Sequence, residues 1–159
     1  MNAARRGELI ARYRHGPAVV EELVAGLTDE ELDHQPADGG WSPREVVHHL
    51  ADSEMTSAIR LRRILAEDAP VIHGYDPDEF ARRLRYGSRP PGPSLAAVRA
   101  ARESTAPILD LLTEDEWSRS GDHTESGPYS VETWLEIYAS HAHDHAAQIE
   151  RAVSELRDP

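Results

Sequence analysis

The chain has 159 residues, enough for one domain with a sizeable hydrophobic core, and we predict a single domain over residues 1–159. It contains no cysteine, which excludes disulfides, thiolate metal sites and a cysteine nucleophile. The net charge of −12 argues against nucleic acids and anionic membranes as partners. With neither a secretion signal nor an apolar run of about 18 residues, we expect a cytoplasmic protein.

The first predicted helix covers residues 4–27, where apolar side chains recur at helical spacing. Gly16 and Pro17 interrupt this stretch, so we expect a kink or a break there. Residues 28–32 predict a short capped turn of helix, followed by a loop at 36–40.

The second predicted helix has the clearest start signal in the chain. Ser42 suits the N-cap position, Pro43 suits the first helical position, and Glu45 completes a capping box with Ser42. We expect this helix to run from residue 43 to about residue 66.

Residues 68–93 form a stretch that prolines and glycines interrupt repeatedly, with one short helix expected at 78–84. The stretch is too long for a simple connector, and long crossover loops often build functional sites. Ser94 is the expected N-cap of a third long helix, in which Pro107 predicts a kink.

After a loop at 118–128, Ser130 is the expected N-cap of a fourth helix over residues 131–156. No segment of strand length alternates clearly between apolar and polar residues. The predicted fold class is therefore all-α, a four-helix bundle with one long crossover connection.

Three of the nine histidines are predicted to face the interior of this bundle. His141 and His145 are four residues apart on the fourth helix and continue the stripe that contains Tyr138. His49 shares the apolar face of the second helix. Its neighbour His48, together with His143, falls on a polar face and is expected at the surface.

Such a trio can hold one metal ion and leave one coordination position open, and open positions are where metals do chemistry. Single histidines near a core are more often hydrogen-bonded structural residues. Three imidazoles buried together without a metal or an acid are costly, which favours the metal site. The motif HExxH is absent, so a protease of the zincin type is not predicted.

Other side chains are candidates for a second shell or a pocket around the trio. Asp52 and Asp144 each follow a candidate ligand by three residues; the helical phase favours the outer face, although either can orient an imidazole through its second nitrogen. Tyr75 and His123 lie in predicted loops and can reach a pocket, and Tyr138 lies on the inward stripe. No catalytic residue is identified from the sequence.

Two motifs resemble signatures of the DinB/YfiT-like family. They are Trp-Ser-Pro-Arg-Glu-Val-Val-His-His-Leu at residues 41–50 and Tyr-Ala-Ser-His-Ala-His-Asp-His at residues 138–145. The resemblance implies a four-helix bundle, often dimeric, in which His49, His141 and His145 bind a divalent metal, commonly zinc or nickel. The chain departs from the family pattern at Ser140, Asp144 and Gln148, and none of these departures removes a ligand.

Family members are described as metal-dependent hydrolases or as transferases that use bacillithiol, mycothiol or glutathione. We therefore expect an enzyme that transfers a low-molecular-weight thiol to an electrophile through a metal-bound thiolate, with these small molecules and a second copy of the chain as partners. A hydrolase that uses metal-activated water is the alternative. A metal-binding stress-response module without turnover, or a trio that only fastens two helices together, stays open as well.

Overall fold

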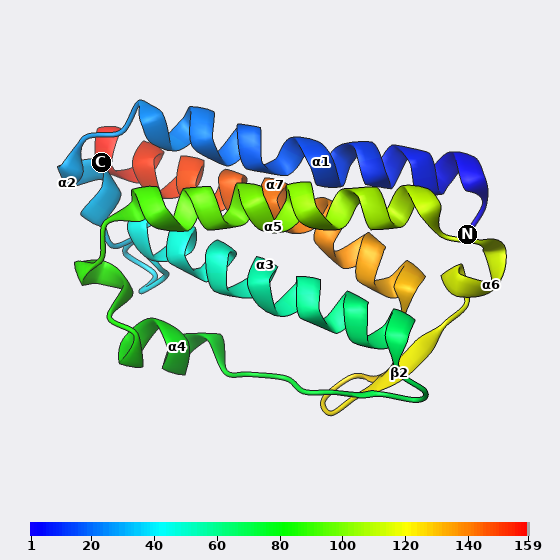
Figure 1. Cartoon of the computed structure of the whole chain (residues 1–159). Coiled ribbons are helices and arrows are strands. Elements are labelled where there is room, and N and C mark those ends of the chain that lie inside the picture. The colour runs from blue at the N-terminus through cyan, green and yellow to red at the C-terminus, as the bar shows by residue number, and fades with distance from the viewer. Residues whose placement is uncertain (159) are drawn as a thin grey trace.

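The computed structural model describes residues 1–158 as a bundle of four long helices (Figure 1). These helices are α1 (Ala3–Ala25), α3 (Pro43–Ala66), α5 (Pro91–Leu111) and α7 (Val131–Arg157). α1 packs against α5 and α7, and α3 packs against the same two helices, so the four form a closed ring. The predicted all-α bundle is confirmed, and Ser42 and Glu45 form the predicted capping box at the start of α3.

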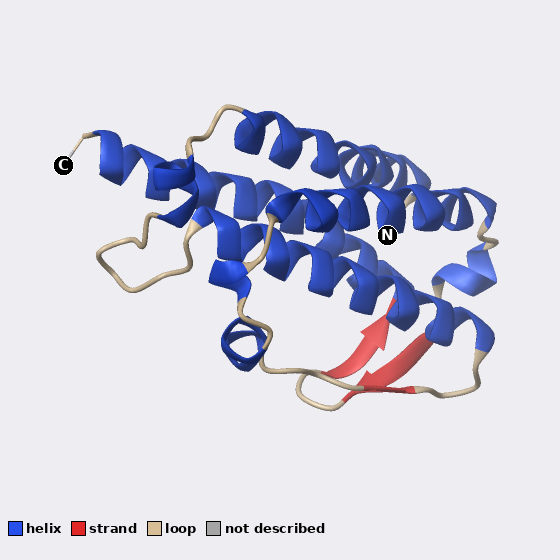
Figure 2. Cartoon of the chain, turned by 60° about the vertical axis from the view of Figure 1, so that its left-hand side comes forward, coloured by secondary structure: helices blue, strands red, loops and turns tan. Residues whose placement is uncertain are grey.

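The helices follow an up-down-down-up order in Figure 1, in which α3 and α5 run in the same direction. The chain must therefore return along the bundle between them. This crossover contains β1 (Val71–Ile72), the expected short helix as α4 (Pro77–Arg83), and the 3-10 turn η1 (Tyr86–Ser88). It lies outside the bundle, along α3 (Figure 2).

A small sheet connects the crossover to the segment before α7, and the sequence did not predict it. β1 pairs in parallel with β2 (Ser120–His123), which pairs antiparallel with β3 (Gly127–Ser130). Strands of two to four residues are too short to show an alternating pattern. Gly121 allows the close approach, because a Cβ there would lie 2.4 Å from the carbonyl oxygen of Pro70.

Two short helices lie ahead of the long helices α3 and α7. α2 (Asp29–Asp33) precedes α3, and α6 (Glu114–Trp117) precedes β2 and α7. Both begin with a threonine that closes a capping box. These boxes satisfy backbone N–H groups that a helix start would otherwise leave without acceptors.

α1 is continuous through Gly16 and Pro17, so of the kink or break expected there the break does not occur. Pro17 has no N–H to donate to the carbonyl of Tyr13, four residues earlier. Arg102 of α5 donates its Nη1–H to that carbonyl instead, at 2.6 Å. Gly16 makes room for the guanidinium, because a Cβ there would lie 2.3 Å from Arg102 Nη1. A side chain from a neighbouring helix thus replaces the missing backbone donor.

Two further expectations are corrected at the start of α5. The helix begins at Pro91, so Ser94 is not its N-cap. The Ser94 hydroxyl lies 2.7 Å from Nδ1 of His48, and Nε2 of His48 lies 3.1 Å from the carbonyl oxygen of Arg89. His48 is completely buried rather than at the surface, because the crossover covers the polar face of α3. A carbonyl can only accept, so Nε2 is the donor to Arg89, and burial lowers the pKa of His48, which favours the neutral ring with Nδ1 accepting from the Ser94 hydroxyl.

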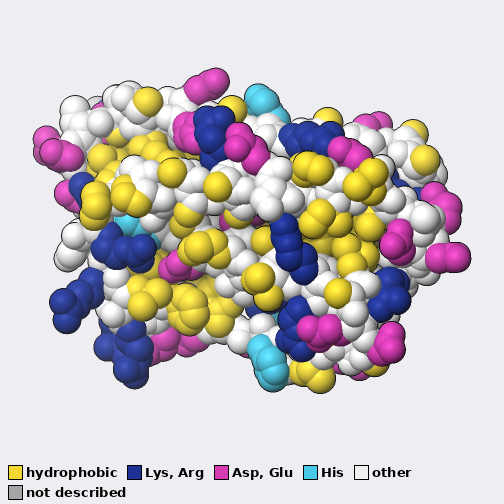
Figure 3. All heavy atoms as spheres, viewed as in Figure 1, with side chains coloured by type: hydrophobic (Ala, Val, Ile, Leu, Met, Phe, Trp, Pro, Cys, Tyr) yellow, Lys and Arg dark blue, Asp and Glu magenta, His cyan; other side chains and the backbone are white. Residues whose placement is uncertain are grey.

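Two apolar clusters fill the bundle, one around Trp134 and one around Leu50. Several polar side chains are also buried in the middle of the bundle, among them Glu54 and Arg102. On the face shown in Figure 3, acidic and basic side chains are interspersed with hydrophobic ones. Within residues 1–158, none of the helices combines the length and apolar character that crossing a membrane requires.

Candidate metal centre

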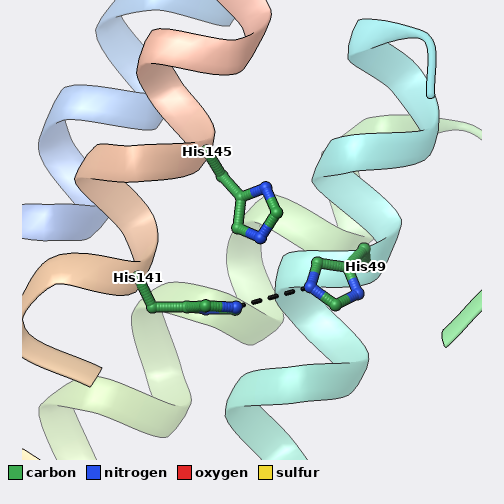
Figure 4. Close-up of side chains that lie close together, drawn as sticks. All are labelled: His49, His141 and His145. Atoms are coloured by element: carbon green, nitrogen blue, oxygen red, sulfur yellow. Dashed lines mark hydrogen bonds between the residues drawn. The ribbon is translucent and has the colours of Figure 1, made fainter. Parts of the chain in front are cut away.

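Three imidazoles from two helices converge at mid-bundle (Figure 4). His49 belongs to α3, while His141 and His145 lie one turn apart on α7. The Nε2 atoms of His49 and His141 are 3.4 Å apart, and one ring nitrogen from each of the three residues lies within 4.8 Å of the others. The three side chains that the helical phase selected are therefore close enough to hold one ion.

The Nδ1 atoms of the three histidines are consistent with metal binding through the Nε2 atoms. Nδ1 of His145 lies 2.8 Å from Oε1 of Gln148, which makes Nδ1 the donor and leaves Nε2 with a free lone pair. Nδ1 of His49 and of His141 is buried without a hydrogen-bond partner among the described residues. Metal–nitrogen bonds of about 2.0–2.1 Å at a tetrahedral angle place two ligand nitrogens about 3.3–3.4 Å apart. The measured 3.4 Å separation fits such an ion.

Burial keeps the three imidazoles neutral. Burial lowers the pKa of His49 to about 3 and that of His141 to about 2, and the neighbouring imidazoles act in the same direction. Burial also lowers the pKa of His145, which the hydrogen bond to Gln148 partly opposes. Neutral imidazoles offer their lone pairs at pH 7, so an incoming cation displaces few protons.

Two of the three histidines, His49 and His141, line a cleft of about 240 Å³ between α3, α7, the crossover and the β2–β3 turn. His49 and His141 form its inner end, and the outer end contains residues from the loops. This volume lies below the ~300–1,000 Å³ of pockets that enclose drug-sized ligands. The cleft is therefore too small to enclose a drug-sized molecule completely. Its walls consist of His49, Ser53, Arg60, Gly74, Tyr75, Pro77, His123, Glu125, Tyr138 and His141.

Three of the predicted pocket residues, Tyr75, His123 and Tyr138, line this cleft. Burial raises the pKa of both tyrosines, while the Ser53 hydroxyl and the Arg60 charge act in the opposite direction. Both phenols are therefore protonated at neutral pH and can donate hydrogen bonds into the cleft.

The two aspartates predicted as a second shell are placed elsewhere. Asp52 accepts a hydrogen bond from the Tyr86 hydroxyl at 2.5 Å, so it anchors the crossover rather than an imidazole. Asp144 is exposed and contributes only a weak charge effect on the pKa of His145. Gln148, which we noted only as a departure from the family pattern, has the orienting position.

Sequence reasoning missed four residues around the trio. Trp41 packs on His49 with ring centroids 4.6 Å apart, and Ser53, Arg60 and Glu125 line the cleft. Ser53 and Arg60 follow His49 by four and eleven residues, which is the same helix face, so the helical period could have identified both. Glu125 lies in a turn, and no sequence signal places it here.

A helical bundle with this topology and an interhelical three-histidine cluster defines a known class of protein. The chain belongs to the DinB superfamily, whose profile matches residues 12–149. The resemblance that the two motifs indicated is therefore confirmed.

Relatives within this class carry one description. "Putative metal-dependent hydrolase YfiT" of Bacillus subtilis is 35% identical over 134 residues, which cover 84% of this chain and 75% of that protein. A relative from Oceanobacillus iheyensis with the same description is 37% identical over 133 residues, 84% of this chain and 77% of its own. The solved structure of Bacillus subtilis YfiT matches with a TM-score of 0.93 at 30% identity, covering 99% of this chain and 90% of that one, and its topology is described as an unusual four-helix bundle.

Proposed function

We propose that the chain is a divalent-metal-dependent enzyme that transfers a low-molecular-weight thiol to an electrophile. The observation that carries this proposal is the convergence of His49, His141 and His145, of which His49 and His141 line a cleft. Imidazole nitrogens suit zinc or nickel. A divalent ion at this position favours the deprotonated form of a thiol at neutral pH.

The residues of the cleft suit the remaining steps of such a transfer. The sulfur forms a bond to an electrophilic carbon, the leaving group departs with its electron pair, and the thiol proton passes to solvent. Tyr75 and Tyr138 are protonated and line the cleft, so they can donate hydrogen bonds to the leaving group or to a polarised carbonyl of the electrophile.

Hydrolysis is the second candidate, and the descriptions of the relatives favour it. Hydrolysis by a metal-activated water is usually assisted by a general base near the metal. In the described part of the chain, Glu125 is the one carboxylate that lines the cleft, and it is exposed in the turn between β2 and β3. Thiol transfer does not require such a base, and for this reason we place it first.

The test is to purify the chain without a histidine tag, measure its metal content, and follow conjugation of monochlorobimane to bacillithiol, mycothiol and glutathione. Ester and amide hydrolysis are assayed with the same preparation. We expect about one divalent ion per chain and conjugation that depends on both metal and thiol.

Two variants serve as a matched pair in this assay. His141→Ala should lose both metal and conjugation, while His143→Ala, two residues away on the same helix, should keep both. Metal binding with hydrolysis but without conjugation would replace our proposal with the hydrolase. Metal binding without any turnover would leave a binding module.

A further inference from the structure

Arg60 is a cation in the wall of the cleft that has no carboxylate partner in the described part of the chain. It forms no ion pair within residues 1–158, although many of the other arginines do. Its Nη2 donates to the carbonyl oxygen of His73 at 2.5 Å, while its Nε is buried without any hydrogen-bond partner. A buried donor that stays unpaired costs free energy, so the protein does not fully satisfy the hydrogen-bonding capacity of this guanidinium.

The surroundings of Arg60 hold the guanidinium at the outer half of the cleft. Its central carbon lies 5.7 Å from the ring centroid of Tyr75, which is within the range of a cation–π contact. Its charge also lowers the pKa of His123, although burial is the larger cause of that shift. A positive charge therefore acts on the aromatic walls of the cleft.

The position of Arg60 relative to the histidines limits the length of the ligand. Arg60 follows His49 by eleven residues, so their Cα atoms are about 16 Å apart along α3. Side chains on a helix lean toward its N-terminus, which brings the guanidinium back toward the histidines. A ligand that reaches both ends must carry its anionic group several bonds away from the atom at the metal.

We propose that Arg60 binds a carboxylate of the substrate whose reactive atom occupies the open side of the three-histidine centre. This inference rests on the proposed function and adds a substrate class to it: a thiol, or a hydrolysable compound, with a carboxylate remote from its reactive group. Guanidinium groups form paired hydrogen bonds with carboxylates, and the one hydrogen bond that the Arg60 guanidinium makes within residues 1–158, to the His73 carbonyl, leaves N–H groups for such a pair.

The experiment uses the full chain loaded with Co²⁺, whose absorption spectrum reports the binding of sulfur ligands. The probes are glutathione, in which both carboxylates are remote from the sulfur, and its dimethyl ester. The variants are Arg60→Gln and Arg63→Gln. Arg63 is a matched control because it also donates to a crossover carbonyl, that of Val71, but does not line the cleft.

We expect Arg60→Gln to weaken glutathione binding by about 10- to 100-fold, as for a lost charge-assisted hydrogen bond, and to leave ester binding nearly unchanged. Arg63→Gln should leave both affinities within about twofold of those of the parent chain. If Arg60 only holds the crossover in place, its loss will weaken acid and ester equally, and that result overturns the inference. If Arg60→Gln does not fold, Arg60→Lys replaces it: reduced discrimination between acid and ester supports the inference, and unchanged discrimination overturns it.

A second arm separates the failure of this inference from the failure of the proposed thiol transfer. If glutathione, its ester, bacillithiol and mycothiol all leave the Co²⁺ spectrum of the parent chain unchanged, thiol transfer fails, and adipate and its dimethyl ester are then compared by calorimetry. Adipate binding that Arg60→Gln abolishes supports a carboxylate site for a substrate without sulfur. Equal adipate binding by the two chains, or none by the parent chain, overturns the inference.

Discussion

His145 and His143 differ by two positions on α7 and lie in different surroundings. His145 belongs to the trio, while the His143 ring stacks on His15 and its Nε2 lies 3.0 Å from the carbonyl oxygen of Arg12. Replacing His145 by alanine should lower metal affinity by more than about 100-fold, because ligand loss exceeds the effect of outer-shell changes. Replacing His143 should not alter it. Competition with a chelating dye measures both, and equal affinities would contradict the assignment of the ligands.

Gln148 orients His145 through a single hydrogen bond. Gln148→Ala should lower metal affinity by about 10- to 100-fold, the usual cost of losing an outer-shell partner. Gln148→Glu keeps the acceptor and makes the imidazole more basic, so its affinity should equal or exceed that of the parent chain. The same dye competition tests both variants, and a Gln148→Ala chain with unchanged affinity would show that packing alone orients His145.

The inward-facing histidines could be selected from the sequence because a helix of period 3.6 gives each residue a definite face. The same reasoning placed His48 wrongly, since phase defines the direction of a side chain but not what covers it. The crossover covers that face of α3, and its path depends on contacts distant in sequence, such as the one between Ser94 and His48.

The crossover is fastened to α3 at two points, the half-buried Asp52 and the buried His48. Tyr86→Phe removes the hydroxyl that Asp52 accepts from and leaves a half-buried carboxylate without this partner. We expect it to lower the free energy of unfolding by about 1–3 kcal/mol, measured by chemical denaturation. His73→Ala, an exposed side chain on the same crossover, should change it by less than about 0.5 kcal/mol. Equal effects of the two changes would contradict the anchoring role of Tyr86.

Long elements could be predicted where local signals agree, as in α3, whose capping residues and apolar period indicate the same start. The start of α5 could not, because Ser94 has the chemistry of an N-cap but its hydroxyl serves His48. The strands β1 to β3 exist through pairing between distant segments, which leaves no local pattern in so few residues.

The stability of the whole metal-free chain should depend on pH through its buried histidines. In the unfolded chain their pKa is about 6.5, whereas in the folded chain that of His49 is about 3 and that of His141 about 2. The unfolded chain therefore binds more protons in this window. Their contribution is complete above pH 6.5, and the free energy of unfolding falls as the pH falls below it, by at most about 1.4 kcal/mol per pH unit for each histidine.

Chemical denaturation between pH 7.5 and 5, with a chelator present, measures this slope. His141→Gln, which removes one such group, should show a shallower slope than the parent chain. Identical slopes would mean that His141 is hydrated in the metal-free chain.

At the level of the whole molecule, fold class and family could be predicted from the sequence, since helix period and the two motifs extend over most of its length. The homodimer, the cytoplasmic location and the absence of nucleic-acid and membrane partners stay predictions. They depend on surfaces and surroundings that a single chain does not contain.

The buried ion pair of Arg102 and Glu54 helps to connect all four long helices, because Arg102 of α5 pairs with Glu54 of α3 and also donates to the carbonyls of Tyr13 in α1 and Tyr138 in α7. Arg102→Met leaves a buried carboxylate unpaired and should cost about 3–5 kcal/mol of unfolding free energy. The double change Glu54→Leu with Arg102→Met should recover part of this cost. Denaturation curves of the single and the double variant measure both losses of unfolding free energy. An equal or greater loss in the double variant would contradict the pairing of Arg102 with Glu54.

The hydrogen bond from Arg102 to the Tyr13 carbonyl also has an evolutionary consequence. As long as position 17 is proline, that carbonyl depends on Arg102 for a donor. Loss of the arginine therefore leaves both the Tyr13 carbonyl and the Glu54 carboxylate without their partner. A lineage in which Pro17 has become alanine has its own N–H for this carbonyl and tolerates the loss better. The order in which these two positions mutate therefore determines which descendants of this chain still fold.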